Sequence, residues 1–178
     1  DGDGTCDAND STPDGEGSCS FDNITSSSAD INCSSDVGIY GFQFDISGVT
    51  LTGASSGLPN VSFGATTIIG FDMSGGSLPA GDGTLVSLTF DPSSAGSTLS
   101  VSDFILSGAV GSTIASSAPA DASIPGCDDA DCLGVCGGSA ADLGCGCEQA
   151  GPSGCDNVCG STLEEDVCGI CGGDGSAC

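Results

Sequence analysis

Short stretches of alternating apolar and polar residues occupy the middle of the chain. The segments "IYGFQFDI" (39–46) and "TLVSLTF" (84–90) place a large apolar side chain at every second position. The alternating apolar residues are Tyr40, Phe42, Phe44, Ile46, Val86, Leu88 and Phe90. A period of two is that of a β-strand with one buried face. We therefore expect both segments to be strands that bury these side chains in a core.

Further segments between these two and beyond them have the length and composition of short strands. They are "VTLT" (49–52), "VSFG" (61–64), "TTIIGFDM" (66–73), "STLSVSDFIL" (97–106) and "AVGSTIA" (109–115). Gly, Ser, Pro and Asp separate them, and no helical periodicity is present. Several short strands with frequent turn residues are typical of a β-sandwich. The predicted fold class is therefore mostly β, and about 90 residues are enough for one modest sandwich core.

The order of these segments resembles a known family. "GIYGFQFDISGVTLTGAS", "IIGFDMSG" and "SLPAGDGTLVSLTF" follow one another as in the jelly-roll β-sandwich of cohesins and related carbohydrate-binding modules. The resemblance covers about half of the chain and consists of hydrophobic pattern. It implies a cohesin-like sandwich, with a protein partner docked on a sheet face or a polysaccharide as the ligand. No docking residue is identified by it.

The distribution of cysteine divides the chain into three regions. Residues 1–35 are acidic, rich in Ser and Gly, and contain three cysteines, whereas residues 36–125 contain none and carry most of the apolar residues. Residues 126–178 contain ten cysteines and 13 glycines. Such a segment has too few large apolar side chains to fold without covalent cross-links. We expect an N-terminal acidic segment, a sandwich over 36–125, and an irregular, disulfide-rich repeat region over 126–178.

The C-terminal region has an internal repeat with a period of 23 residues. Shifting the chain by this period aligns Cys132 with Cys155 and Cys178, Cys136 with Cys159, and Cys145 with Cys168. Cys178 is therefore expected to open a repeat. The segment "DVCGICGGDGSAC" (166–178) is similar to a motif of thrombospondin-motif metalloproteases and to cysteine-glycine repeats in surface proteins of aquatic microbes. That resemblance implies a cross-linked spacer without metalloprotease chemistry, because the chain has no His.

The cysteine content predicts disulfides and an oxidising, extracellular or cell-surface location. The thirteen cysteines are Cys6, Cys19, Cys33, Cys127, Cys132, Cys136, Cys145, Cys147, Cys155, Cys159, Cys168, Cys171 and Cys178. Zinc held by four thiolates is the alternative for the C-x-x-C pair at Cys168 and Cys171. Because thirteen is odd, at least one cysteine is expected to lack a partner within the chain. Cys178 and the three N-terminal cysteines are best placed to pair outside it.

The charge of the chain excludes several classes of function. It contains 25 acidic residues and no Lys, Arg or His, so its net charge is -25. Binding to nucleic acid needs cations to displace counterions, and an anionic membrane surface repels such a protein. General bases of the His and Lys type are absent, so no enzyme is expected; a carboxylate-pair glycosidase is the remaining enzymatic alternative. No apolar stretch approaches the roughly 18 residues that span a bilayer, so membrane insertion is not expected.

The first ten residues, "DGDGTCDAND", fit most of a calcium-binding loop. If the first loop Asp precedes the printed sequence, the ligands are Asp1, Asp3, Thr5, Asp7 and Asp10, and Gly4 makes the sharp turn. The segment resembles loops of dockerins and of thrombospondin type 3 repeats. A solvated acidic tail is the other interpretation. We expect calcium to bind here.

Two sequons predict N-linked glycans. Asn23-Ile24-Thr25 and Asn60-Val61-Ser62 both have the acceptor pattern. In a secreted protein these positions are expected to be exposed and modified.

Together these features predict a non-catalytic extracellular structural protein. We expect its copies to join head to tail into a filament, with an extended segment of one copy adding a strand to the sheet edge of the next. Residues 21–31 are the candidate donor segment. The alternative is a cohesin-like module that binds a protein partner or polysaccharide without polymerising.

Overall fold

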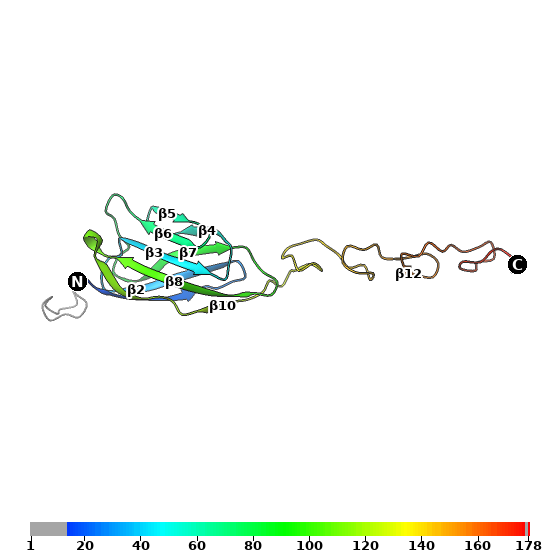
Figure 1. The fold of residues 1–178 in the computed structure, drawn as a ribbon, viewed down its shortest axis with the longest axis horizontal. Coiled ribbons are helices and arrows are strands. Elements are labelled where there is room, and N and C mark those ends of the chain that lie inside the picture. Colours follow the sequence, from blue (N-terminus) through cyan, green and yellow to red (C-terminus); the bar gives the residue numbers. More distant parts are fainter. Residues whose placement is uncertain (1–13, 177) are drawn as a thin grey trace. The chain divides into compact units, whose positions relative to one another are not determined.

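The computed structural model describes residues 14–176 and residue 178. The chain divides into two compact units, Asp1–Cys127 and Asp128–Cys178. The first contains the long strands of Figure 1, and the second, yellow to red in the same figure, consists of turns with two very short strands.

The described part of the first unit is built from strands and a single turn of 3-10 helix. The elements are β1 (Glu16–Asp22), β2 (Ser28–Ser35), β3 (Gly41–Ser47), β4 (Leu51–Ser55), β5 (Asn60–Phe63), β6 (Thr67–Phe71), β7 (Gly81–Phe90), β8 (Ser97–Ser107), η1 (Ala109–Gly111), β9 (Thr113–Ser117) and β10 (Ala122–Ile124). Nine of the strands follow the order β4-β7-β2-β1-β9-β8-β3-β6-β5, and β10 pairs with β8. The predicted mostly-β fold is confirmed.

The sandwich consists of two layers that one strand connects. One layer is β4-β7-β2-β1 and the other is β8-β3-β6-β5. Strand β9 joins them, because it pairs in parallel with β1 and antiparallel with β8. The buried apolar residues come from both layers, so the core lies between them.

The alternating residues of the sequence form this core, as predicted. Phe42, Phe44 and Ile46 of β3 are buried, as are the three predicted apolar residues of β7. The ring centroid of Phe44 lies 5.9 Å from that of Phe42 and 5.8 Å from that of Phe104. Tyr40 differs from the prediction because it precedes β3 and is only half-buried.

The N-terminal hairpin belongs to the sandwich, which differs from the expected domain boundary at residue 36. Strand β2 pairs with β7 over its whole length, and Ile31 is fully buried. Cys19 and Cys33 face each other across β1 and β2 and form a disulfide. Residues 21–31, the expected donor segment, therefore lie within their own sheet. The reason is the period of two in both strands, which turns Cys19, Phe21, Ile31 and Cys33 toward the core.

Aspartate-centred turns recur in the second unit. The Asp131 carboxylate accepts hydrogen bonds from the backbone N–H groups of Leu133, Val135 and Ala140 at 2.9 to 3.0 Å. The Asp166 carboxylate accepts three N–H groups in the same way, from Cys168, Ile170 and Gly175. The carboxylates thus satisfy the backbone donors of turns that have no core beneath them.

These hydrogen bonds predict a pH dependence of the second unit. The backbone N–H of Val135 and then that of Ala140 hold the pKa of Asp131 below its ordinary value of 3.8. Hydrogen bonds from Ile170 and Gly175 lower the pKa of Asp166 in the same way. Because only the ionised carboxylate accepts all these bonds, its stabilisation is complete above pH 3.8 and is lost as the pH falls through the lowered pKa.

We therefore expect the backbone amide signals of Ile170 and Gly175 to shift in an NMR titration with a midpoint below 3.8. The variant Asp166→Asn should abolish this titration at both amides. The amides of Val135 and Ala140 serve as the matched control, because they should keep their own low midpoint in the variant. A midpoint at or above 3.8 in the unmodified protein would contradict the prediction.

Overlapping disulfides hold the second unit together. The bridges are Cys132–Cys147, Cys145–Cys159, Cys155–Cys171 and Cys168–Cys178. Each bridge begins before the preceding one ends, so neighbouring loops share residues. All twelve cysteines of the described residues are disulfide-bonded, Cys127 and Cys136 among them. The predicted disulfide framework is confirmed, and the four-thiolate zinc alternative for Cys168 and Cys171 is wrong.

Cys178 pairs differently from its counterparts in the repeat, and its opening of a further repeat stays a prediction. Its aligned counterparts Cys132 and Cys155 pair with cysteines further along the chain, whereas Cys178 pairs backward with Cys168 and closes a loop. The same bridge removes Cys178 as a cysteine that pairs outside the chain, and the Cys19–Cys33 bridge removes two others. Cys6, the remaining candidate, lies outside the described residues.

Candidate functional site

The two outer faces of the sandwich differ in chemistry. On the layer β4-β7-β2-β1 the outward rows are polar: Ser18 lies opposite Ser34, and Ser20 opposite Asn32. None of the exposed large apolar side chains of the described residues lies on these four strands. On the other layer, exposed apolar residues occupy β6 and β8. This second outer face is the candidate site.

The apolar residues of this face are Ile69 and Phe71 on β6 and Ile105 on β8. Their side chains are 38%, 40% and 45% exposed, respectively. Gln43 of β3 lies between Ile69 and Ile105, because it is the cross-strand partner of both. Phe71 is the next outward-facing residue of β6 after Ile69, and it is paired with Gly41 of β3. We call Ile69, Phe71 and Ile105 the apolar row.

The pleat of the sheet holds these side chains outward. Ile68, which precedes Ile69, is fully buried opposite Phe44. Successive residues of a strand point to opposite faces, so Ile69 cannot enter the core while Ile68 fills it. Gly70 is opposite Phe42 and leaves room for its ring, since an added Cβ would lie 2.2 Å from the ring. The exposure of the apolar row is therefore a consequence of core packing.

Acidic and hydroxyl groups surround the apolar row. Asp45 of β3 faces outward in the row after Gln43, and its carboxylate accepts a hydrogen bond from the Thr67 hydroxyl at 2.5 Å. Asp103 lies exposed in the irregular stretch of β8, with φ 50°. Asp72 directly follows Phe71, and hydrogen bonds from Ser74, first from its hydroxyl and then from its N–H, lower the pKa of Asp72. The face is thus apolar with a negative rim.

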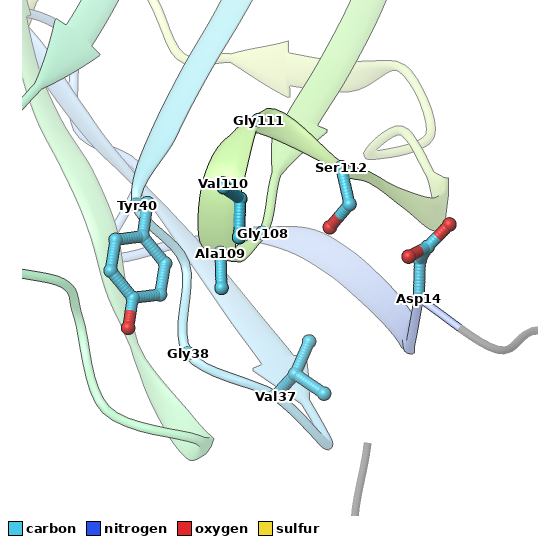
Figure 2. Close-up of a pocket in the computed structure, with 9 residues that line it drawn as sticks. All are labelled: Asp14, Val37, Gly38, Tyr40, Gly108, Ala109, Val110, Gly111 and Ser112. Atoms are coloured by element: carbon cyan, nitrogen blue, oxygen red, sulfur yellow. The ribbon is translucent and has the colours of Figure 1, made fainter.

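A second feature is a hollow of about 680 Å³ at one end of the sandwich. Figure 2 shows Tyr40 on one side and the carboxylate of Asp14 and the hydroxyl of Ser112 on the other. Val110 lines the hollow with φ 58°, a left-handed conformation that is unusual for a β-branched residue. The hollow is open to solvent and holds one aromatic ring. It offers one carboxylate and no cation.

Of the predicted site residues outside the cysteines, the structure describes the two sequon asparagines, which lie in different parts of the sandwich unit. The calcium ligands Asp1, Asp3, Thr5, Asp7 and Asp10 lie outside the described residues. The sequon residue Asn23 is exposed in the β1–β2 turn, where its side-chain amide donates to the Asp30 carboxylate at 2.8 Å. Asn60 begins β5 at the edge of the candidate face.

The apolar row was missed by the sequence analysis. The segment "TTIIGFDM" carries apolar residues at adjacent positions, so periodicity does not say which of Ile68 and Ile69 is buried. The available signal was this excess of apolar residues. A strand with one buried face buries only one of two adjacent residues, so one of Ile68 and Ile69 had to be exposed. The same excess occurs in "DFIL", where Phe104 packs against the core and Ile105 is exposed.

Comparisons with known proteins give a similarity in fold. No protein-family model matches the chain, and no curated protein matches it. Three solved structures are similar: a non-cellulosomal cohesin from the archaeon Archaeoglobus fulgidus, a type I cohesin–dockerin complex from Clostridium thermocellum, and the CaDoc0917–CaCohA2 complex. Their identities are 12%, 11% and 17%, and their TM-scores 0.47, 0.49 and 0.48.

The alignments cover 61%, 65% and 62% of this chain and 89%, 95% and 99% of the matched chains. No residue or partner is carried over from them. Within the described residues, no helix has the length and apolar character needed to cross a membrane.

Proposed function

We propose that this chain is a non-catalytic extracellular module that binds another protein through the outer face of β8, β3, β6 and β5. The supporting observation is the difference between the two outer faces. Exposed apolar side chains that are neighbours on a surface mark interaction sites. Aliphatic and aromatic residues typically supply the buried centre of an interface, with polar groups at its rim. The apolar row and its acidic surroundings have this arrangement.

The charge of the chain indicates the chemistry of the partner. Asp45, Asp72 and Asp103 belong to or flank the proposed docking face, and the whole chain has no Lys, Arg or His. Interfaces are electrostatically complementary, and like charges that face each other weaken binding. We therefore propose a partner protein whose apolar contact residues are flanked by Lys or Arg. A second copy of this chain would bring the same negative charge without a cation.

The absence of enzymatic chemistry is part of the same proposal. The acidic pairs Asp128-Asp129 and Glu164-Glu165 are exposed. A glycosidase needs two carboxylates that face each other across a cleft with different protonation states. These exposed pairs lack the buried environment in which a catalytic acid is held. An extracellular location is supported by the disulfide-bonded cysteines.

Filament formation stays a prediction. Its proposed donor, residues 21–31, is part of the chain's own sheet, so a filament would need another joining segment. The calcium ligands of the first ten residues and a polysaccharide ligand likewise stay predictions. A second copy on the docking face is therefore treated as an outcome of the binding experiment.

The docking face is tested by site-specific cross-linking. We expect p-benzoylphenylalanine at position 69 to cross-link the partner in the native extracellular medium, and the same group at position 34, on the opposite outer face, to leave it unlinked. The cross-linked protein is then identified and purified. Removing two apolar anchors with Ile69→Ser and Ile105→Ser should raise its Kd about 100-fold, as expected for central interface residues.

The matched control is the pair Ser20→Ala and Ser34→Ala on the polar outer face, which should leave the Kd within about twofold. Higher salt should weaken binding if the partner is basic. Cross-linking of a second copy would replace the proposed partner with self-association. Equal cross-linking from positions 69 and 34, or an unchanged Kd in the Ile69 and Ile105 variant, would contradict the docking face.

A further inference from the structure

The sequon at Asn60 lies directly beside an exposed aromatic ring. Asn60 of β5 is the cross-strand partner of Phe71 of β6, so both side chains lie on the same outer face. Cβ atoms of such partners are about 5 Å apart. The Asn60 side-chain nitrogen Nδ2 donates a hydrogen bond to the Phe71 carbonyl at 3.3 Å. The acceptor nitrogen for a glycan is thus held next to the ring.

The ring also has free surface on this side. Phe71 is 40% exposed. Its other cross-strand partner is Gly41, which has no side chain to cover it. Strand β5 is the edge of its layer among the described residues, where β6 is the strand paired with it. A group attached to Nδ2 can therefore reach the ring from the open edge.

We propose that Asn60 is glycosylated and that its first sugar packs against the Phe71 ring. The sequon Asn60-Val61-Ser62 is the acceptor, and the donor is an oligosaccharide on a lipid pyrophosphate, as in secretory pathways. The anomeric carbon forms a bond to Nδ2, its bond to the pyrophosphate oxygen breaks, and Nδ2 gives up one proton. The lipid pyrophosphate leaves with the electron pair. The second N–H of Nδ2 still donates to the Phe71 carbonyl.

The packing follows from the chemistry of both groups. One face of a pyranose ring presents C–H groups, and the face of an aromatic ring carries partial negative charge that attracts them. The contact also removes apolar area of Phe71 from water. Glycosylation should therefore stabilise the β5–β6 edge beyond any general effect of attaching a sugar.

The same contact has a consequence for docking, and this step rests on the proposed function. Phe71 is one end of the apolar row, so a sugar on its ring covers part of the docking face. Glycosylation of Asn60 would then weaken binding of the partner, and the unmodified protein would be the form that docks. The site is thereby a means of regulating the face.

The packing is tested with protein secreted from eukaryotic cells. Mass spectrometry should find Asn60 occupied. Removing this glycan with Asn60→Gln should lower the Tm by about 3 °C when residue 71 is Phe. In a Phe71→Leu background, which keeps an apolar side chain without a ring, the same change should have less than half of this effect. An unoccupied Asn60, or equal losses in both backgrounds, would overturn the proposal.

Asn23→Gln is the matched control. Asn23 is also in a sequon, but its amide is bonded to the Asp30 carboxylate and lies in a turn. The effect of this variant on the Tm should not depend on Phe71. A dependence as large as that of Asn60→Gln would show that Phe71→Leu acts through general stability, and would overturn the specific contact.

Partner binding separates the two proposals. If both hold, Asn60→Gln should bind the partner about tenfold more tightly than the glycosylated protein, a change equivalent to about 1.4 kcal/mol. If the Tm difference depends on Phe71 but the Kd does not change, the sugar contact stands and the docking face at Phe71 is wrong. If the Kd changes without a Phe71-dependent Tm, the docking face stands and the sugar contact is wrong.

Discussion

Replacing Phe44 with alanine is expected to lower the free energy of unfolding of the sandwich by about 3–5 kcal/mol. Phe44 is fully buried, is paired with Ile68 on β6, and its ring lies beside those of Phe42 and Phe104. The substitution removes this apolar area and leaves a cavity that the two layers cannot close without moving. Equilibrium urea denaturation of the full chain, followed by a probe of the strands, measures the loss.

The control for this variant is Gln43→Ala. Gln43 is the preceding residue of the same strand and is exposed on the outer face. Its substitution should change the free energy of unfolding by no more than about 0.5 kcal/mol. A Phe44→Ala protein as stable as the Gln43→Ala protein would show that the sandwich core is not packed around Phe44.

Reduction of the disulfides is expected to unfold the second unit while the sandwich stays folded. No residue of 128–176, nor residue 178, is buried. Bridges therefore replace a core, and a disulfide of this loop length typically contributes about 2–4 kcal/mol. The sandwich has one bridge, Cys19–Cys33, within its described strands, but also a continuous buried core. Hydrogen exchange should thus accelerate throughout 128–178 and remain slow in β3 and β7.

A variant with a single missing bridge serves as the control. Cys145→Ala with Cys159→Ala removes one bridge without reductant, and should accelerate exchange most between these positions. The neighbouring bridges Cys132–Cys147 and Cys155–Cys171 remain in this variant, so loss should be local. Unchanged exchange of residues 128–178 in strong reductant would contradict the role of the bridges.

The two proposals for the sandwich concern the same outer face, where opposite charges are expected across the docking interface. In these proposals the negative rim attracts a basic partner to the apolar row, and a glycan at Asn60 limits access to one end of that row. Both depend on residues of one sheet layer, which the core holds rigidly in place. The second unit has no part in either proposal.

Several features were determined by the sequence alone. The period of two in residues 39–46 and 84–90 predicted which side chains of β3 and β7 share the core, because side chains alternate along any strand. The cysteine content predicted a disulfide-linked C-terminal region without a core, since its apolar residues are too few to bury one another. The charge led to the prediction that nucleic acid is not a partner, because the chain contains no Lys, Arg or His; this stays a prediction. Each of these inferences needs only local pattern or composition.

The tertiary structure alone decided which apolar side chains are exposed, which strands pair and which cysteines form disulfides. Adjacent apolar residues such as Ile68 and Ile69 compete for the core, and pairing of β6 with β3 places Ile68 inside and leaves Ile69 exposed. Residues 16–35 join the sandwich through β7, about fifty residues away in sequence. The pairing of Cys178 with Cys168 likewise depends on which sulfurs meet in space. Local alternation specifies the face of a strand, whereas its neighbours are set by long-range contacts that no local pattern encodes.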